Sequence, residues 1–221
     1  MFQLKSLGKS HEHIFSMVYK EKIWGLSEAD DLPFNSGNGS IESLVVEPYI
    51  NAVESFLSKL PNRASAVDLG CGDFRVGSRL VDFFDSYIAC DVVKEVIEFN
   101  IEHYRDLGVD FRVLDLTRGP IPVSDVLIVR QVLQHLSNEA IHRFINLIPQ
   151  EVKYLLITEH LPSEKPFRAN RNGATGPDIR LSRKSGVVLT KEPFNLTAQS
   201  QEVLVSVPSS FGSIVTTAYK L

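Results

Sequence analysis

Residues 65–77 read SAVDLGCGDFRVG, a short apolar strand that runs into a glycine-rich turn. A turn that binds the pyrophosphate of a dinucleotide carries glycines at its first, third and sixth positions. Gly70 and Gly72 fit this spacing, but Arg75 stands at the sixth position. Asp68 precedes the first glycine by two residues, and its carboxylate would repel a pyrophosphate. The stretch therefore predicts a site for a ligand that carries positive charge.

Short apolar runs alternate with helical patterns on both sides of this turn. Strands that are buried on both faces of a sheet read as such continuous runs. Strands that alternate with helices predict a parallel sheet with right-handed crossovers. The expected strands are 64–69, 86–91, 109–114, 125–130 and 153–158, and the expected helices are 43–59, 75–84, 92–106 and 137–148.

The last part of the chain has a different pattern. Residues 201–207 (QEVLVSV) and 213–221 (SIVTTAYKL) are strand-like, and only 208–212 (PSSFG) separates them. Two strands joined without a helix are expected to pair as an antiparallel hairpin. The sequence therefore predicts an α/β domain whose mostly parallel sheet ends in a hairpin.

Acidic residues end three of the predicted strands. Asp91 ends the second strand, about 20 residues after the turn, where a carboxylate can accept hydrogen bonds from both hydroxyls of a ribose. Asp115 follows the third strand, where it can accept from the amine of an adenine that Leu116 covers. With Asp68, these positions describe a pocket for a nucleoside joined to a cationic amino acid. This is the chemistry of S-adenosylmethionine, whose carboxylate the N–H groups of a glycine turn can bind.

Four stretches resemble the class I S-adenosylmethionine-dependent methyltransferases: VDLGCGDFRVG, CDVV, LDLT and DVLIVRQVLQHLS. The resemblance implies a Rossmann-like, seven-stranded, doubly wound sheet in the order 3-2-1-4-5-7-6, with strand 7 antiparallel and helices on both faces. It covers roughly 43–221, the expected methyltransferase domain, and leaves 1–42 as an N-terminal extension. It is closest to small bacterial methyltransferases with a Gly-Ser-rich segment before the domain. The implied product is S-adenosylhomocysteine, and the implied cofactor contacts are Asp68, Gly70, Cys71, Gly72, Arg75, Asp91, Val92, Asp115, Leu116, Arg130 and Gln131.

Candidate catalytic residues follow the fourth and fifth strands. Arg130 ends the fourth strand and is expected to face the transferred methyl group or the acceptor. His135 is a candidate general base, although it can equally hold its loop in place, and Glu159 with His160 is a second candidate pair. Methyl transfer depends mainly on alignment and exclusion of water, so a strong base is optional.

Two segments are expected to cover the site. Residues 36–40 (SGNGS) can form a backbone nest for an anion or a plain surface turn. Nearby aromatic residues favour a lid made of Tyr19, Trp24, Ser36, Gly37, Asn38, Gly39 and Ser40. The polar stretch 162–186 is the longest expected loop, and loops of this length often bind ligands. Its residues Arg168, Arg171 and Arg180 can bind an acidic acceptor or be solvated.

Composition limits the function classes. The net charge is −4 and basic residues are scattered, so a nucleic-acid partner is not expected. The chain has no membrane-length apolar run, and its two cysteines are expected to be free thiols of a cytoplasmic protein. The His-Glu-His run at 11–13 lacks a third ligand, so no metal site is expected.

The expected reaction is methylation of a small polar acceptor, most simply at a hydroxyl oxygen of a sugar-like or specialised metabolite. Three alternatives stay open: methylation of a protein side chain, binding of S-adenosylmethionine by a non-catalytic regulator, and NAD-dependent oxidoreduction. The last predicts stabilisation by NAD, which the turn chemistry disfavours.

Overall fold

The structure is a computed structural model that describes residues 8–25, 32–164, 166–210 and 212–221. The predicted extension 1–42, the loop 162–186 and the turn 208–212 each include positions outside these ranges. The strands are β1 (Ser65–Leu69), β2 (Ser86–Asp91), β3 (Asp110–Val113), β4 (Val126–Arg130), β5 (Tyr154–Pro162), β6 (Ser200–Ser209) and β7 (Gly212–Lys220). The α-helices are α1 (His11–Lys20), α2 (Ser43–Leu57), α3 (Lys94–His103) and α4 (Asn138–Leu147).

The seven strands form one sheet in the order β3-β2-β1-β4-β5-β7-β6. Strands β1 to β5 pair in parallel, whereas β7 is antiparallel to both β5 and β6. The predicted strand order and terminal hairpin are confirmed.

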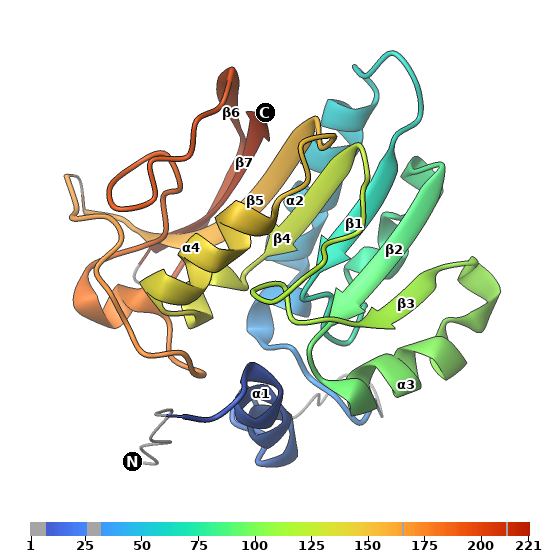
Figure 1. The fold of residues 1–221 in the computed structure, drawn as a ribbon, viewed down its shortest axis with the longest axis horizontal. Coiled ribbons are helices and arrows are strands. Elements are labelled where there is room, and N and C mark those ends of the chain that lie inside the picture. The colour runs from blue at the N-terminus through green and yellow to red at the C-terminus, as the bar shows by residue number, and fades with distance from the viewer. Residues whose placement is uncertain (1–7, 26–31, 165, 211) are drawn as a thin grey trace.

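The sheet separates two hydrophobic cores, because successive strand residues point to opposite faces. In β1, Val67 and Leu69 pack into the core that α4 helps to form, and Ala66 packs into the core under α2. Figure 1 shows α4 and α2 on opposite faces of the sheet, and α1 below the ends of the strands. Within the described ranges, no helix is long and apolar enough to cross a membrane.

The predicted helix at 75–84 is wrong. This stretch forms two 3-10 turns, Gly77–Arg79 and Val81–Phe83. Gly77 packs so closely on Phe74 that a Cβ on it would lie 2.3 Å from the ring. This contact and the poor helix propensity of glycine and serine favour short turns over a regular helix.

Pro48 lies inside α2 without breaking it. The partner that its missing N–H would have used is the carbonyl of Leu44, in the first turn of the helix. Leu44 is 84% exposed, so water can reach this region of the helix. A proline this close to the helix start therefore costs less than one in a buried interior.

Candidate functional site

A cavity of about 250 Å³ lies at the carboxyl ends of the parallel strands. Ligands of open α/β sheets bind at this edge, where the strand order reverses between β1 and β4. Most of the site residues that the sequence predicts line this cavity. They are Tyr19, Trp24, Ser36, Gly37, Asn38, Gly39, Ser40, Asp68, Gly70, Cys71, Gly72, Asp91, Val92, Asp115, Leu116, Arg130, Gln131, His135 and His160. The predicted residues that the structure places outside its lining are Arg75, Glu159, Arg168, Arg171 and Arg180.

The glycine turn holds β1 against β2. The N–H groups of Gly70 and Cys71 both donate to the carbonyl of Cys90, at 2.8 and 2.9 Å. Gly70 has φ +79°, and a Cβ there would lie 2.5 Å from Cγ2 of Val132. Both the backbone conformation and the close approach of the β4 loop therefore require glycine.

Asp68 is buried beside the turn. It accepts a hydrogen bond from the hydroxyl of Tyr87 at 3.1 Å. Burial raises the pKa of Asp68 to about 7, against the lowering effects of Tyr87 and Arg130. A neighbouring cation would favour its ionised form, which suits a ligand ammonium group.

Asp91 is anchored by backbone groups. Its Oδ2 accepts from the N–H of Gly72 at 3.0 Å, and its Oδ1 accepts from the N–H of Val93 at 2.9 Å. Burial raises the pKa of Asp91, and these hydrogen bonds oppose the rise. Each carboxylate oxygen keeps a second lone pair, so the group can still accept from a ligand.

Asp115 joins the end of β3 to helix α1. Its Oδ1 accepts from the N–H and the hydroxyl of Thr117, and its Oδ2 lies 3.1 Å from Nδ1 of His11. Desolvation raises the pKa of Asp115, but the hydrogen bonds from His11 and Thr117 outweigh it and lower the pKa to about 2. The sequence does not predict the contact between His11 and Asp115, because 104 residues separate them.

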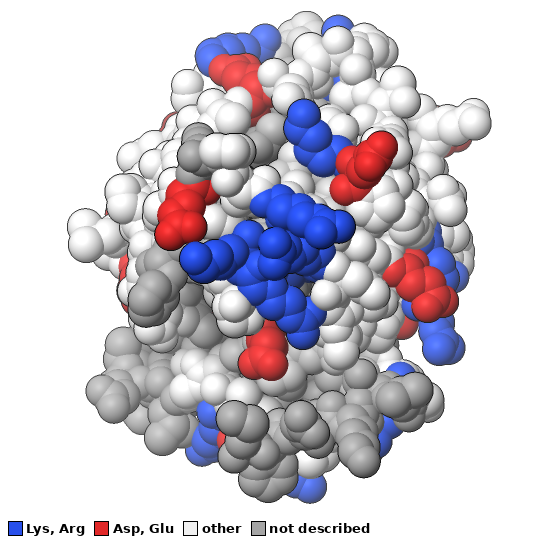
Figure 2. Space-filling model, turned by 90° about the vertical axis from the view of Figure 1, so that its left-hand side faces the viewer, with Lys and Arg blue, Asp and Glu red and all other residues white. Residues whose placement is uncertain are grey.

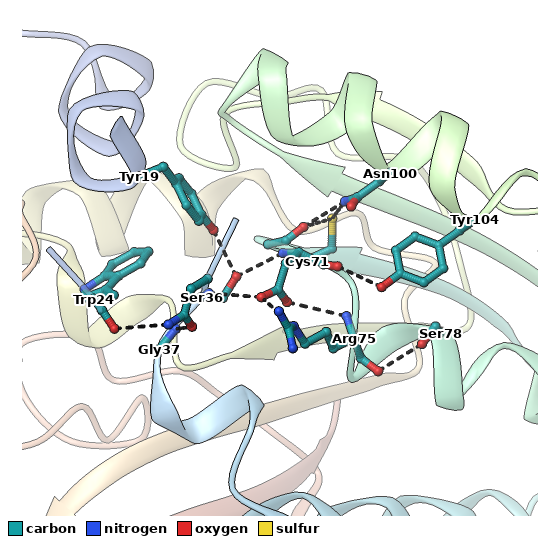
Figure 3. A network of polar contacts seen from close by, with 12 residues as sticks. Tyr19, Trp24, Ser36, Gly37, Cys71, Arg75, Ser78, Asn100 and Tyr104 are labelled. Atoms are coloured by element: carbon teal, nitrogen blue, oxygen red, sulfur yellow. Dashed lines mark hydrogen bonds and ion pairs between the residues drawn. The ribbon is translucent and has the colours of Figure 1, made fainter. Parts of the chain in front are cut away.

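The segment after α1 packs directly on the glycine turn. Ser36 and Asp73 exchange two hydrogen bonds: the N–H of Ser36 donates to Oδ2 of Asp73 at 3.0 Å, and the N–H of Asp73 donates to Oγ of Ser36 at 2.9 Å. The Tyr19 hydroxyl lies 3.0 Å from the same Oγ (Figure 3). Arg75, a predicted cofactor contact, turns its Nε to Asp73 at 3.2 Å. Asp73 directly follows Gly72 in the glycine turn, but the sequence gives no sign that Asp73 pairs with Ser36, which lies 37 residues earlier.

The predicted nest at 36–40 meets the end of β4. Asn38–Ser40 forms a 3-10 turn, and the carbonyl of Gly39 accepts from Nη2 of Arg130. A Cβ on Gly39 would lie 2.3 Å from Nε2 of Gln131. The segment therefore fits closely over the fourth strand end.

Arg130 is a partly buried cation. Its guanidinium lies 4.9 Å from the centre of the Tyr49 ring, and burial lowers its pKa. In the part of the chain that the structure describes, Nε of Arg130, Nε2 of Gln131 and the hydroxyl of Tyr49 are buried without hydrogen-bond partners. Buried polar groups are rarely left unpaired, so these atoms mark a place for ligand atoms or water.

Gln134 links the two candidate histidines. Its Oε1 accepts from the backbone N–H of His160 at 3.2 Å, which turns its amide nitrogen toward Nε2 of His135 at 3.4 Å. Desolvation lowers the pKa of His135 to about 4 and also lowers that of His160, so both rings are neutral at pH 7. The described residues offer no hydrogen-bond partner to Nε2 of His160.

Glu159 points away from the cavity that its neighbour His160 lines, as alternation along a strand requires. Its Oε1 accepts from the N–H of Leu133 at 3.1 Å, under the turn that carries His135. Burial raises the pKa of Glu159 to about 8. The structure therefore does not place the predicted pair, Glu159 and His160, side by side in the cavity.

The predicted loop arginines lie in two environments. Arg168 and Arg171 are exposed, whereas Arg180 is buried. The guanidinium of Arg180 donates to the carbonyls of Leu136 and Arg171 and to Oδ1 of Asn138. Arg180 thus ties the loop to the start of α4, a role for which the sequence gives no signal.

Neither a protein-family model nor a curated protein sequence matches the chain. Solved structures do. The N-methyltransferase NodS from Bradyrhizobium japonicum WM9, in complex with S-adenosyl-L-homocysteine, is 12% identical with a TM-score of 0.65, over 95% of this chain and 98% of NodS. A SAM-dependent methyltransferase from Leishmania major is 15% identical with a TM-score of 0.63, over 97% of this chain and 87% of that one.

A third similar structure is the 1,6-didemethyltoxoflavin-N1-methyltransferase of Burkholderia thailandensis, with its substrate and S-adenosylhomocysteine. It is 16% identical with a TM-score of 0.60, over 95% of this chain and 86% of that one. These likenesses extend over nearly the whole chain and include the strand order. The chain therefore has the Rossmann-like fold of the class I S-adenosylmethionine-dependent methyltransferases.

Proposed function

We propose that this protein is a methyltransferase that uses S-adenosylmethionine and methylates a small polar acceptor. The observation that carries the proposal is the single cavity rim on which Asp68, Asp91 and Asp115 meet the glycine turn. When bound, S-adenosylmethionine supplies an electrophilic methyl group on a positively charged sulfur. Similar folds solved with S-adenosylhomocysteine support the assignment.

The residues present fit this cofactor. Asp91 would accept from the ribose hydroxyls, and Asp115 with Leu116 would hold the adenine, because these groups line one side of the cavity in strand order. Asp68 would receive the ammonium group, with a pKa of about 7 that a bound cation lowers. Val92, Cys71 and Gln131 complete this part of the lining.

The acceptor would enter where the cavity is lined by β4 and β5 residues and by the N-terminal segment. Trp24 packs against His135 with ring centres 5.2 Å apart, and Tyr19 packs on Trp24 at 5.5 Å. These rings keep water out of the cavity, and methyl transfer requires that water be excluded. The unpaired polar atoms of Arg130, Gln131 and His160 suit a hydroxyl-rich acceptor, such as a sugar-like metabolite.

His160 is the better placed general base of the two histidines. Nε2 of His135 accepts a hydrogen bond from the Gln134 amide, so the neutral ring carries its proton on Nδ1. The ring of His135 is therefore left without a free acceptor nitrogen. Neutral His160, with its Nε2 unpaired, can accept the proton of an acceptor hydroxyl.

Calorimetry with S-adenosylmethionine, S-adenosylhomocysteine and NAD tests the cofactor assignment. We expect both adenosyl compounds to bind at one site per chain and NAD not to bind. Saturable NAD binding without adenosyl binding would overturn the assignment. Turnover is then followed by S-adenosylhomocysteine release from a panel of hydroxylated, amine and protein acceptors. Binding of S-adenosylmethionine with no turnover on any of them would instead identify a sensor.

A further inference from the structure

The loop between β5 and β6 carries a basic surface, made of Arg168, Arg171, Arg183 and Lys184. All four side chains are exposed. Figure 2 shows Lys and Arg side chains gathered at the centre of the face toward which this loop turns in Figure 1. The chain as a whole has a net charge of −4, so this concentration of positive charge is local.

The fold brings these residues together from two limbs of the loop, which are the segments 168–172 and 183–186. The N–H of Asn170 donates to the carbonyl of Gly186 at 3.0 Å, and the N–H of Arg171 donates to Oγ of Ser185 at 3.0 Å. The guanidinium of Arg183 reaches back to the carbonyl of Asn172 at 2.7 Å. The limbs therefore run side by side, and cations 12 or more residues apart share one surface.

Little of this charge is neutralised. Lys184 lies 3.7 Å from Glu164, but both side chains are more than three-quarters exposed, and such pairs are weak. Arg168 and Arg171 have no carboxylate within ion-pair distance among residues 8–25, 32–164, 166–210 and 212–221. The buried guanidinium of Arg180 ties this loop to the start of α4 through carbonyl and amide oxygens.

The same loop walls the cavity. Pro177 and Ile179 line it, and the carbonyl of Pro177 accepts from the indole of Trp24 at 3.4 Å. The N–H of Gly176 donates to the carbonyl of His135 at 3.0 Å. Arg171 is joined to this wall through Arg180, which donates to the carbonyl of Arg171 and to the carbonyl of Leu136, a residue that lines the cavity.

We propose that the acceptor carries a phosphate group, which binds the basic surface while the reactive hydroxyl enters the cavity. This rests on the proposed function and adds the substrate class. Three of the four exposed cations are arginines, whose planar guanidinium matches phosphate oxygens with two parallel hydrogen bonds.

The test uses inorganic pyrophosphate as the probe, titrated calorimetrically into the full chain at low salt. The variant R168Q/R171Q removes two charges from the basic surface, and K59Q/R105Q removes two from exposed positions elsewhere. We expect saturable binding to the unmodified protein and to K59Q/R105Q, and binding about 10-fold weaker or more in R168Q/R171Q. S-adenosylhomocysteine affinity should be equal in all three.

Absence of saturable pyrophosphate binding, or an equal loss in both double variants, would overturn the proposal. Because the cofactor titration is separate, the two failures are distinguishable: no binding of S-adenosylhomocysteine would refute the methyltransferase assignment and the acceptor class with it, whereas S-adenosylhomocysteine binding without pyrophosphate binding would refute the phosphate-bearing acceptor alone.

Discussion

The two sides of the cavity differ in how their polar groups are paired. On the proposed cofactor side, Asp91 and Asp115 are held by backbone N–H groups, and Asp68 is held by a tyrosine hydroxyl. On the proposed acceptor side, Nε of Arg130 and Nε2 of His160 are buried and unpaired within the described ranges. Paired groups are already oriented for a ligand, whereas unpaired groups gain most when one arrives.

This difference indicates that the two sides of the cavity contribute to different steps. The proposed cofactor side is formed by strand ends whose carboxylates are held by hydrogen bonds, so a change there should reduce binding or folding. The acceptor side combines distant segments around neutral histidines, so a change there should reduce turnover first. Substitutions on each side test this difference.

The largest expected effect is on turnover. His160→Asn should lower kcat by about 100-fold or more, because a general base contributes 10²–10⁴-fold. S-adenosylhomocysteine affinity should stay within about twofold, and His135→Asn should lower kcat less. Equal kcat in His160→Asn and the unmodified protein would remove His160 from catalysis.

The next effect is on folding of the cofactor side. Gly70→Ala should lower the free energy of unfolding by about 2–5 kcal/mol, since it combines a left-handed backbone with a contact to Val132. Gly108→Ala is the control, because Gly108 has φ +66° but no atom within 4 Å of its Cβ position. It should cost only about 1–2 kcal/mol. Equal losses in denaturant unfolding would show that close packing at the turn is unimportant.

A smaller effect is on cofactor affinity. Asp91→Asn keeps the shape of the side chain but removes its charge, so S-adenosylmethionine should bind about 10- to 100-fold more weakly. Calorimetry gives the affinity directly. Asp110→Asn, an exposed substitution on the neighbouring strand, is the control and should leave it unchanged. Unaltered affinity in Asp91→Asn would contradict the ribose assignment.

The placement of the three aspartates around one cavity was predictable from the sequence, whereas the contacts of the segments packed against it were not. Asp68, Asp91 and Asp115 follow strands that periodicity identifies, and parallel strands bring their ends to one edge. The contacts of His11, Ser36 and Asp73 depend on how a segment outside the sheet packs on the turn, which no local pattern encodes. Adjacency in the sequence suggests that Glu159 and His160 act as a pair, but both lie within β5, where adjacent residues face opposite sides of the sheet.

The smallest effect is a pH dependence of stability from Glu159. Its folded pKa of about 8 lies above the ~4.3 of an unfolded glutamic acid, so the folded state keeps a proton that the unfolded state releases. The stability of the unmodified protein therefore falls as pH rises between these values. Glu159→Gln removes this dependence while its amide oxygen can still accept from Leu133.

The difference in unfolding free energy between Glu159→Gln and the unmodified protein should thus grow from pH 5 to pH 8 in favour of the variant, by on the order of 1 kcal/mol or more. Chemical denaturation at several pH values measures it. A difference that stays constant with pH would show that Glu159 is ionised in the fold.

A crystal structure with S-adenosylhomocysteine would show whether the three aspartates hold the cofactor. We expect the adenine against Leu116 and Asp115, the ribose hydroxyls on Asp91 and the amino group toward Asp68. We also expect the sulfur to face the side of the cavity that Arg130 and His160 line. A ligand bound elsewhere, or these three carboxylates directed to solvent with the cavity filled by protein, would contradict this assignment.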